Sequence, residues 1–156
     1  MSRFNRAFIL VDPKVLSVEA HAERETDDHL QWHCSYSRGD VLSEARVVIG
    51  TLHGATKQAG FTVTIGSLFI ETGVADTATD YQVAVQESEA LETLYDLCRQ
   101  QAAIVVGMLG LNEKFNVPWK APEPELSVLE EREVGVDDQD DATELSNARG
   151  HENKTD

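Results

Sequence analysis

Two stretches near the start of the chain alternate apolar and polar residues with a period of two. Residues 15–23 are apolar at every second position, and residues 29–36 repeat this at Leu30, Trp32, Cys34 and Tyr36. Such alternation is typical of a half-buried β-strand, because successive side chains point to opposite faces. The polar residues 24–28 between them favour a turn, so we expect an antiparallel hairpin. A short apolar run at residues 7–11 predicts a further short strand or sheet edge.

Helical spacing replaces this alternation after residue 40. Apolar side chains recur at three- and four-residue steps from residue 41 to 59, and Gly60 follows as a terminator. Ser37 and Asp40 fit S-x-x-D, a variant of the capping box, or Asp40 caps alone, and either predicts a helix start within residues 37–40. The tripeptide Arg38-Gly39-Asp40 spells an integrin-binding motif, but we interpret it as part of this helix start.

The next third of the chain predicts two more strands and a second helix. Residues 61–71 are rich in β-branched and aromatic residues, and a phase shift after Gly66 indicates a bulge or bend. Residues 81–86 are predicted to form another strand, and Ser88 is expected to cap the second helix. Its expected buried stripe consists of Leu91, Leu94, Leu97, Cys98, Ala102 and Val105.

The order of these elements predicts an α+β fold. After the short first run the order is β-β-α-β-β-α, which favours one antiparallel sheet of about four to five strands with both helices on one face. The two predicted helix starts, Asp40 and Ser88, lie 48 residues apart. An internal duplication, with a hairpin and a helix in each half, is therefore an alternative description of the same elements.

The composition changes beyond Leu111 and indicates a tail. Pro118, Pro122 and Pro124 come close together, and residues 122–156 then hold 12 acidic and 3 basic side chains out of a chain total of 28 and 13. High net charge with low hydrophobicity prevents a packed core from offsetting chain entropy. We therefore expect an α+β domain at residues 1–121 and a disordered acidic tail at 122–156, with Trp119 anchoring the segment before it.

Length, charge and cysteine content limit the class of protein. The 156 residues suit one domain, and the longest apolar run, residues 102–111, is far shorter than the roughly 20 residues that cross a bilayer. We expect a cytoplasmic protein without a membrane partner. The net charge of −15 disfavours direct nucleic-acid binding, which requires basic side chains against phosphate. Cys34 and Cys98 are expected to be buried thiols and not a disulfide.

The histidines of the first hairpin are weak candidates for a metal site. His29 and His33 share its outer face, and an assumed pairing of the two strands places Glu19 opposite His33. Imidazole and carboxylate groups at that spacing are zinc ligands. The alternative is a solvated sheet face with cross-strand Glu–His pairs, which we favour. We therefore expect neither a metal nor a cofactor, and we interpret His53 as a residue of a polar helix face.

Motifs of catalysis are absent from the sequence, which contains no GxSxG, HExxH, P-loop or GxGxxG pattern. We predict a non-enzymatic interaction or assembly protein, such as a phage or mobile-element accessory factor. A small enzyme or ligand-binding domain that uses the sheet face is one alternative, and a virion or assembly component is another.

Two regions are predicted to make the interactions. The apolar end of the second helix is expected to dock a partner or a second copy, and the acidic tail to contact a basic protein partner. The alternative for the tail is a role in solubility or adaptation to high salt. The candidate residues are Ile104, Val105, Met108, Leu109, Leu111, Trp119, Asp137, Asp138, Asp140 and Asp141.

Overall fold

A computed structural model describes residues 7–22, 28–37, 45–56, 59–72, 81–111 and 116–129 of the chain. It contains a five-stranded sheet and two helices, which confirms the predicted α+β class. The elements are β1 (Ala7–His21), β2 (His29–Ser37), β3 (Ala45–Thr56), β4 (Ala59–Thr72), α1 (Tyr81–Gln86), α2 (Glu89–Met108) and β5 (Glu125–Leu129).

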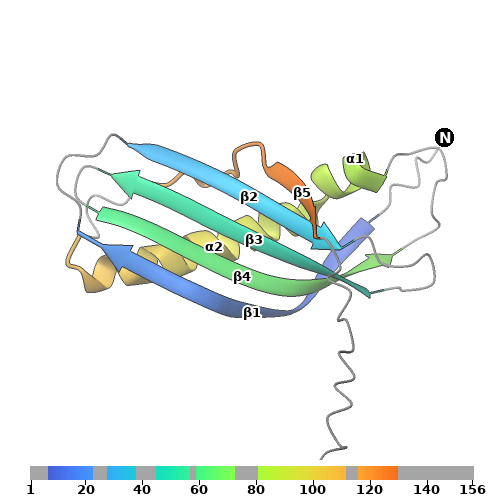
Figure 1. Ribbon diagram of the computed structural model, residues 1–156, viewed down its shortest axis with the longest axis horizontal. Helices are drawn as coiled ribbons and strands as arrows, with labels where there is room; N and C mark the ends of the chain where they lie inside the picture. Colours follow the sequence, from blue (N-terminus) through green and yellow to red (C-terminus); the bar gives the residue numbers. More distant parts are fainter. Residues whose placement is uncertain are drawn as a thin grey trace, which may run out of the picture.

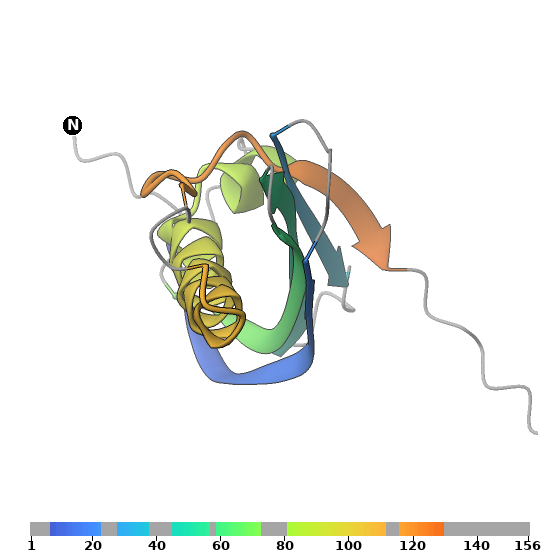
Figure 2. The ribbon, with the colours of Figure 1, turned by 90° about the vertical axis from the view of Figure 1, so that its left-hand side faces the viewer.

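The sheet has the strand order β1-β4-β3-β2-β5 and curves around α2 (Figures 1 and 2). Neighbouring strands from β1 to β2 are antiparallel, whereas β5 runs parallel to β2. The sheet is therefore mixed, and the prediction of a purely antiparallel sheet is correct only for its first four strands. Helix α2 lies along the concave face, and α1 precedes it near one end of the sheet.

The predicted hairpin between the first two strands is wrong, although both strands exist. β1 pairs with β4, and β2 pairs with β3, so two strands separate β1 from β2. Residues 7–11 and 15–21 belong to one long strand, which has bulges after Val11 and after Val15. Gly66 pairs with Lys14, the first paired residue after this bulge, so the expected irregularity lies beside Gly66 but its extra residues are in β1.

The helix predicted from residue 41 is wrong for residues 45–56, which form β3 and continue into β4 as a hairpin. Val48 and Leu52 satisfy a helical period and a strand period equally, because their separation is a multiple of two and also one helical turn. β-Branched neighbours and the buried Gly50 and Gly54 disfavour a helix here. The cap proposed at Asp40 lies outside the described residues.

Residues 81–86 form α1 and not the predicted strand. Ala84 and Val85 are buried side by side, whereas Gln82 and Val83 are exposed, and this grouping does not follow a period of two. A six-residue apolar run does not distinguish a strand from a short helix. The second predicted helix is confirmed as α2, with Ser88 at its N-cap position and Leu91, Leu94, Cys98 and Ala102 among its buried residues.

The boundary predicted at residue 122 is also wrong, because residues 125–129 form β5 and pair with His33–Ser37 of β2. Leu126 and Leu129 are partly buried there, although acidic residues surround this short segment. Two apolar side chains and a row of backbone hydrogen bonds are enough for an edge strand. Residues 130–156 lie outside the described part of the chain. Within that part, no helix is both long and apolar enough to cross a membrane.

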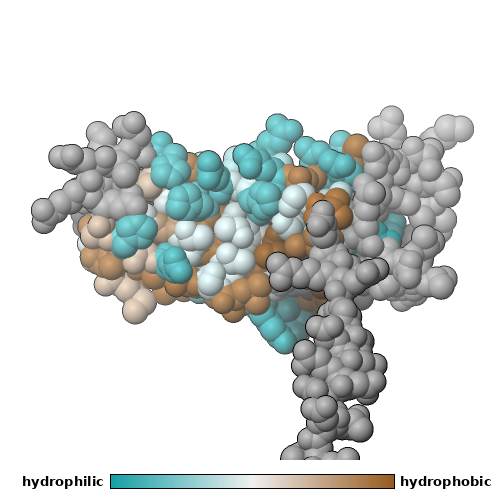
Figure 3. Space-filling view, in the orientation of Figure 1, coloured by the Kyte–Doolittle hydropathy of each residue, from teal (hydrophilic) through white to brown (hydrophobic). Residues whose placement is uncertain are grey.

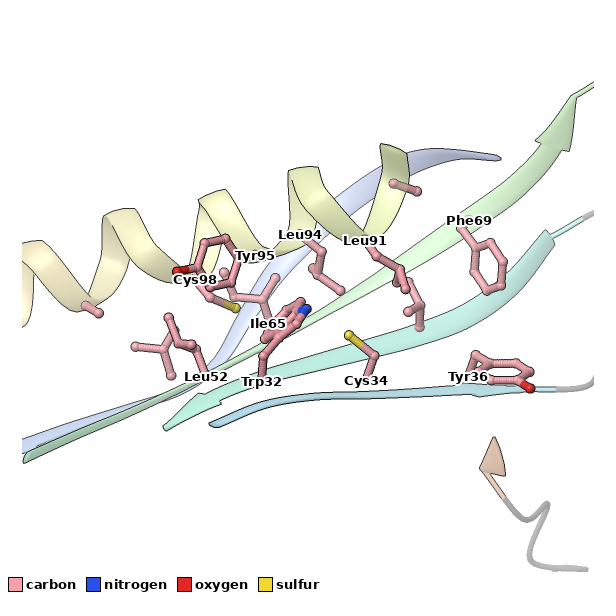
Figure 4. Close-up of a cluster of buried hydrophobic side chains, with 14 of the residues drawn as sticks. Trp32, Cys34, Tyr36, Leu52, Ile65, Phe69, Leu91, Leu94, Tyr95 and Cys98 are labelled. Carbon is pink, nitrogen blue, oxygen red and sulfur yellow. The ribbon is translucent and has the colours of Figure 1, made fainter. Parts of the chain in front are cut away.

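The core lies between α2 and the concave face of the sheet (Figure 4). Leu94 and Tyr95 of α2 are fully buried, and the Tyr95 ring meets Trp32 edge-on at a centroid distance of 5.5 Å. Cys34 and Cys98 are both buried free thiols, which confirms their prediction as small core residues. Burial raises the pKa of both thiols, that of Cys98 to about 12.

Alkaline pH is expected to destabilise the fold through these thiols. A thiol whose pKa is raised by folding stabilises the folded state fully below its ordinary pKa of 9.0, and this stability is lost as the pH rises from there through about 12. We expect the free energy of unfolding, measured in urea, to fall between about pH 8 and about pH 10 by about 1 kcal/mol less in Cys98→Ala than in wild type. Native protein should also resist a thiol reagent until it unfolds. Rapid labelling of both cysteines in the native protein would contradict this burial.

Gly50 is expected to be essential for the approach of α2. A Cβ atom at Gly50 would lie 2.5 Å from Cη2 of Trp32 and 2.8 Å from Cδ2 of Leu94, so Gly50→Ala forces both side chains to move. We expect a loss of about 1–3 kcal/mol in the free energy of unfolding, measured in urea. Gly66→Ala is the matched control, because its Cβ would meet only the flexible end of Leu16 at 3.0 Å. Equal losses in the two variants would refute this account.

Candidate functional site

Residues 116–124, which we call the strap, run back along α2 toward β5. The Tyr95 hydroxyl donates a hydrogen bond of 2.6 Å to the carbonyl oxygen of Pro118. Arg99 Nε donates to the carbonyl oxygen of Val117 at 3.2 Å, and the Val117 side chain is buried. In both hydrogen bonds a side chain of α2 donates to a carbonyl oxygen of the strap. The strap is therefore attached to α2 without the backbone N–H that its prolines lack.

Trp119 lies on this strap in a position that the sequence only partly predicts. The guanidinium carbon of Arg99 is 3.8 Å from the centroid of its ring, which is cation–π geometry. The Trp119 side chain is nevertheless 79% exposed. Trp119 thus contacts its own domain, as expected of an anchor, but most of its surface remains accessible.

A groove of about 540 Å³ lies between the strap, the helices and β2. Strap residues 120–124 form one wall, and residues 86–88 with Leu91 and Glu92 form another. Trp32 of β2 lines the interior, so we call this cavity the Trp32 groove. Its volume is within the range of sites that hold small molecules or a few residues of a peptide.

Two hydrogen bonds hold the strap at this groove. The backbone N–H of Ala121 donates to Oε1 of Glu92 at 3.0 Å. The side-chain amide of Gln86 donates to Oε1 of Glu123 at 3.2 Å. Because these contacts join the strap to α2 and α1, the two walls are held at a defined separation.

Trp32 provides an unusual group at the groove. Its side chain is 2% exposed and points from β2 toward α2 (Figure 4). Its Nε1 atom is buried and has no hydrogen-bond partner among the described residues. A buried donor without an acceptor costs about 1–3 kcal/mol, so an oxygen atom that reached this indole N–H would be bound favourably.

The charges around the Trp32 groove are mainly negative. Glu87, Glu92 and Glu123 line it, and Lys120 is the basic residue among the lining side chains. Leu91 and the two strap prolines provide apolar surface. The groove therefore combines apolar contacts, a buried hydrogen-bond donor and an acidic rim.

The weak metal candidates do not come together. Glu19 of β1 pairs with Thr62 of β4, whereas His29 and His33 lie on β2, and two strands separate β1 from β2. His33 Nε2 instead contacts the hydroxyl groups of Ser127 at 2.9 Å and Ser35 at 3.2 Å. Within the described ranges, no group of three or more histidine, cysteine or acidic side chains has a geometry suited to a metal ion.

The remaining histidines belong to a polar region of the convex sheet face. His53 is on β3 and not on a helix, and its Nδ1 atom is 2.7 Å from the Thr62 hydroxyl. The ring of His29 lies 5.2 Å from that of His53. Figure 3 shows hydrophilic residues gathered over the upper part of this face and apolar residues over its lower part. The outward Leu68 and Val47, each 40% exposed, contribute to the apolar region.

The predicted interaction residues of α2 are accessible. Ile104 is 59% and Met108 81% exposed, and Leu109 is exposed just beyond the helix. Val105 and Leu111 are partly buried and pack against the core. The four aspartates of the predicted tail, Asp137, Asp138, Asp140 and Asp141, lie outside the described residues. These residues remain predicted interaction sites.

The sequence did not reveal the Trp32 groove. Trp32 was assigned to the core from its alternation, which is correct, but its unpaired N–H depends on neighbours from α2 and the strap. The strap residues 122–124 were assigned to the tail. A buried tryptophan normally needs a hydrogen-bond acceptor for its indole N–H. A tryptophan on the inward face of a predicted strand is therefore the one signal in the sequence that points to the site.

Comparisons with known proteins show a likeness of fold. No protein-family model matches the chain, and no curated protein matches it. A solved structure of the Mycobacterium tuberculosis Rv1957 SecB-like chaperone, in complex with a ChAD peptide from the Rv1956 HigA1 antitoxin, matches 75% of this chain and 87% of its own. The TM-score is 0.51 at 16% sequence identity.

A protein of unknown function from Streptococcus agalactiae matches with a TM-score of 0.45 and 10% identity, over 66% of this chain and 90% of its own. At 16% identity, the match to the SecB-like chaperone concerns the fold and not the function. The chain thus has a fold similar to that of a SecB-like chaperone.

Proposed function

We propose that this domain is a protein-interaction module that binds a segment of a partner protein in the Trp32 groove. The observation that carries the proposal is the groove itself, whose lining includes Leu91, the strap prolines and Trp32. The indole N–H of Trp32 is buried and lacks an acceptor among the described residues, so a carbonyl oxygen of a segment that reached it would supply one. The structurally similar SecB-like chaperone was solved with a bound peptide, which supports the same class of ligand here.

The chemistry of the groove favours a segment with apolar side chains. Leu91 and the strap prolines give apolar contacts, which provide most of the affinity in peptide sites. Three glutamates against one lysine disfavour an acidic segment and favour a basic one. This is consistent with the basic protein partner that the acidic composition suggests.

The proposed module is non-enzymatic and cytoplasmic, and it forms a homo-oligomer. Support for self-association comes from α2, whose Ile104 and Met108 side chains are strongly exposed for apolar residues. The acidic residues 130–156 would increase the rate of capture of a basic partner at low salt. A role as a phage or mobile-element accessory factor is compatible with such a module.

Trp32 gives a direct spectroscopic test of the proposal. The chain contains two tryptophans, so a ¹⁵N-labelled sample gives two indole N–H resonances, and Trp119→Phe assigns them. A reduced and carboxymethylated protein, which stays unfolded, is the probe. We expect the Trp32 resonance to shift on addition of the probe, because a carbonyl oxygen accepts its hydrogen bond, and the Trp119 resonance to change little.

The matched variants measure the strength of this contact. Trp32→Phe removes the indole donor and should weaken binding about five- to tenfold, the effect of one hydrogen bond of about 1–1.5 kcal/mol. Val15→Ala, at an exposed residue of β1 that does not line the groove, should leave the affinity unchanged. If Trp32→Phe fails to fold, the resonance of the wild-type protein still decides. An unchanged Trp32 resonance at saturating probe would show that the groove is not the binding site.

A further inference from the structure

One end of the convex sheet face is apolar across three neighbouring strands. Leu68 of β4 pairs with Val11 of β1 on one side and with Val47 of β3 on the other, so the three residues form one row. Their neighbours Val48 and Phe69 are buried in the core, which directs this row to the opposite face. The outward aliphatic residues of this end, which we call the apolar patch, are Ile9, Val11, Leu16, Val47, Ile49, Leu68 and Ile70. Figure 3 shows apolar residues gathered over the lower part of this face, where Figure 1 places β4 and β1.

The apolar patch is strongly exposed for a surface of aliphatic side chains. Leu16 is 57% and Ile9 50% exposed, and Val47 and Leu68 are each 40% exposed. Helix α2 covers the concave face of the same strands, whereas no other described helix or strand lies over their convex face (Figure 2). A sheet that is apolar on both faces normally has a layer on each, so this end lacks its second layer.

Leu16 extends the apolar patch beyond the regular strand ladder. It is the extra residue between Val15 and Ser17, where the register of β1 on β4 shifts. A Cβ atom at Gly66 would lie 3.0 Å from Cδ1 of Leu16, so the leucine side chain lies over this glycine on the convex face. Because Ile49 of β3 pairs with Gly66, Leu16 and Ile49 form a further apolar row.

The charges of the chain favour a second copy as the occupant of the apolar patch. Two copies with a net charge of −15 each repel one another, so they approach closely only through a surface that lacks unpaired acids. The apolar patch has no acidic member, and the charged residues at its border, Asp12 and Lys14, form an ion pair with each other at 3.1 Å. A basic partner is instead attracted to the glutamates around the Trp32 groove.

We infer that the apolar patch is the contact surface of a homodimer in which the convex faces of two sheets pack against each other. A two-fold axis brings the same patch of both copies together, so the contact needs no second surface. Rows of aliphatic side chains suit the packing of one sheet on another. The four most exposed members leave roughly 350 Å² of apolar surface, the centre of a contact that needs about 800 Å² on each copy with its polar rim. This inference rests on the self-association included in the proposed function and names the surface that makes it.

Sedimentation equilibrium of the full-length protein tests this surface. We expect a monomer–dimer equilibrium with a Kd in the micromolar range. Leu68→Glu places a charge at the centre of the contact from both copies and should raise the Kd about tenfold or more. Ile104→Glu is the matched control, because this aliphatic residue of α2 is 59% exposed and lies outside the apolar patch. Its Kd should stay within about twofold of wild type. If Leu68→Glu fails to fold, Leu16→Glu, at the most exposed member, should give the same loss.

Salt separates a second copy from a basic partner. Raising NaCl from about 50 mM to about 500 mM screens the repulsion between two acidic copies and should lower the Kd of the dimer about threefold or more. Binding of polylysine to the acidic rim of the groove should instead weaken over the same range. A dimer that dissociates as salt is added would contradict the charge argument and with it this surface.

The outcomes distinguish this inference from the proposed function. Loss of the dimer in Ile104→Glu, with an intact dimer in both patch variants, would place self-association on α2, which overturns the inference and leaves the proposed function standing. A monomer at every concentration and salt would overturn the inference and the proposed self-association, while the Trp32 resonance decides separately on the groove. Patch variants that keep the dimer but no longer bind the unfolded probe would show that the apolar patch binds a partner protein and not a second copy.

Discussion

The close packing of α2 on the concave sheet is the contact on which the rest of the structure depends. It requires a small residue at Gly50, where the Trp32 ring and Leu94 occupy the space that a side chain would fill. Helix α2 then presents Tyr95 to the strap, whose Pro118 carbonyl accepts its hydrogen bond. The groove exists because the strap, held at this distance from β2, leaves a space that neither element fills.

Strand β2 serves two purposes with one alternating sequence. Its inward residues Trp32, Cys34 and Tyr36 build the core. The side chain of His33 points outward and joins a hydrogen-bond network with Ser127, which attaches β5 to the sheet. That network and the β5 ladder occupy only the second half of β2. Pro124, the residue before β5, has no backbone N–H to donate, which is consistent with the ladder beginning at Glu125.

Local patterns predicted the elements whose period is unambiguous. The alternation at β2 and the helical stripe at α2, with Leu91, Leu94 and Cys98, were correct because each pattern fits one period. The helix predicted at residues 45–56 is wrong because Val48 and Leu52 fit both periods, so only pairing with β4 decides the conformation of this segment. Strand order and β5 depend on contacts between distant residues, such as His33 and Ser127, which are 94 positions apart. The groove combines three such segments and therefore has no local signature.

The unpaired indole of Trp32 connects stability with function. A phenylalanine would avoid the buried donor but would leave empty the space beside Gly50 that the Trp32 ring fills, so the packing of the larger ring offsets the cost of its unpaired N–H. Natural proteins depart from local rules mainly at functional sites, so an unpaired N–H beside a groove is consistent with the proposed binding site. The acidic rim supports the same proposal, since Glu87, Glu92 and Glu123 outnumber Lys120 around the groove and would favour a basic segment over an acidic one.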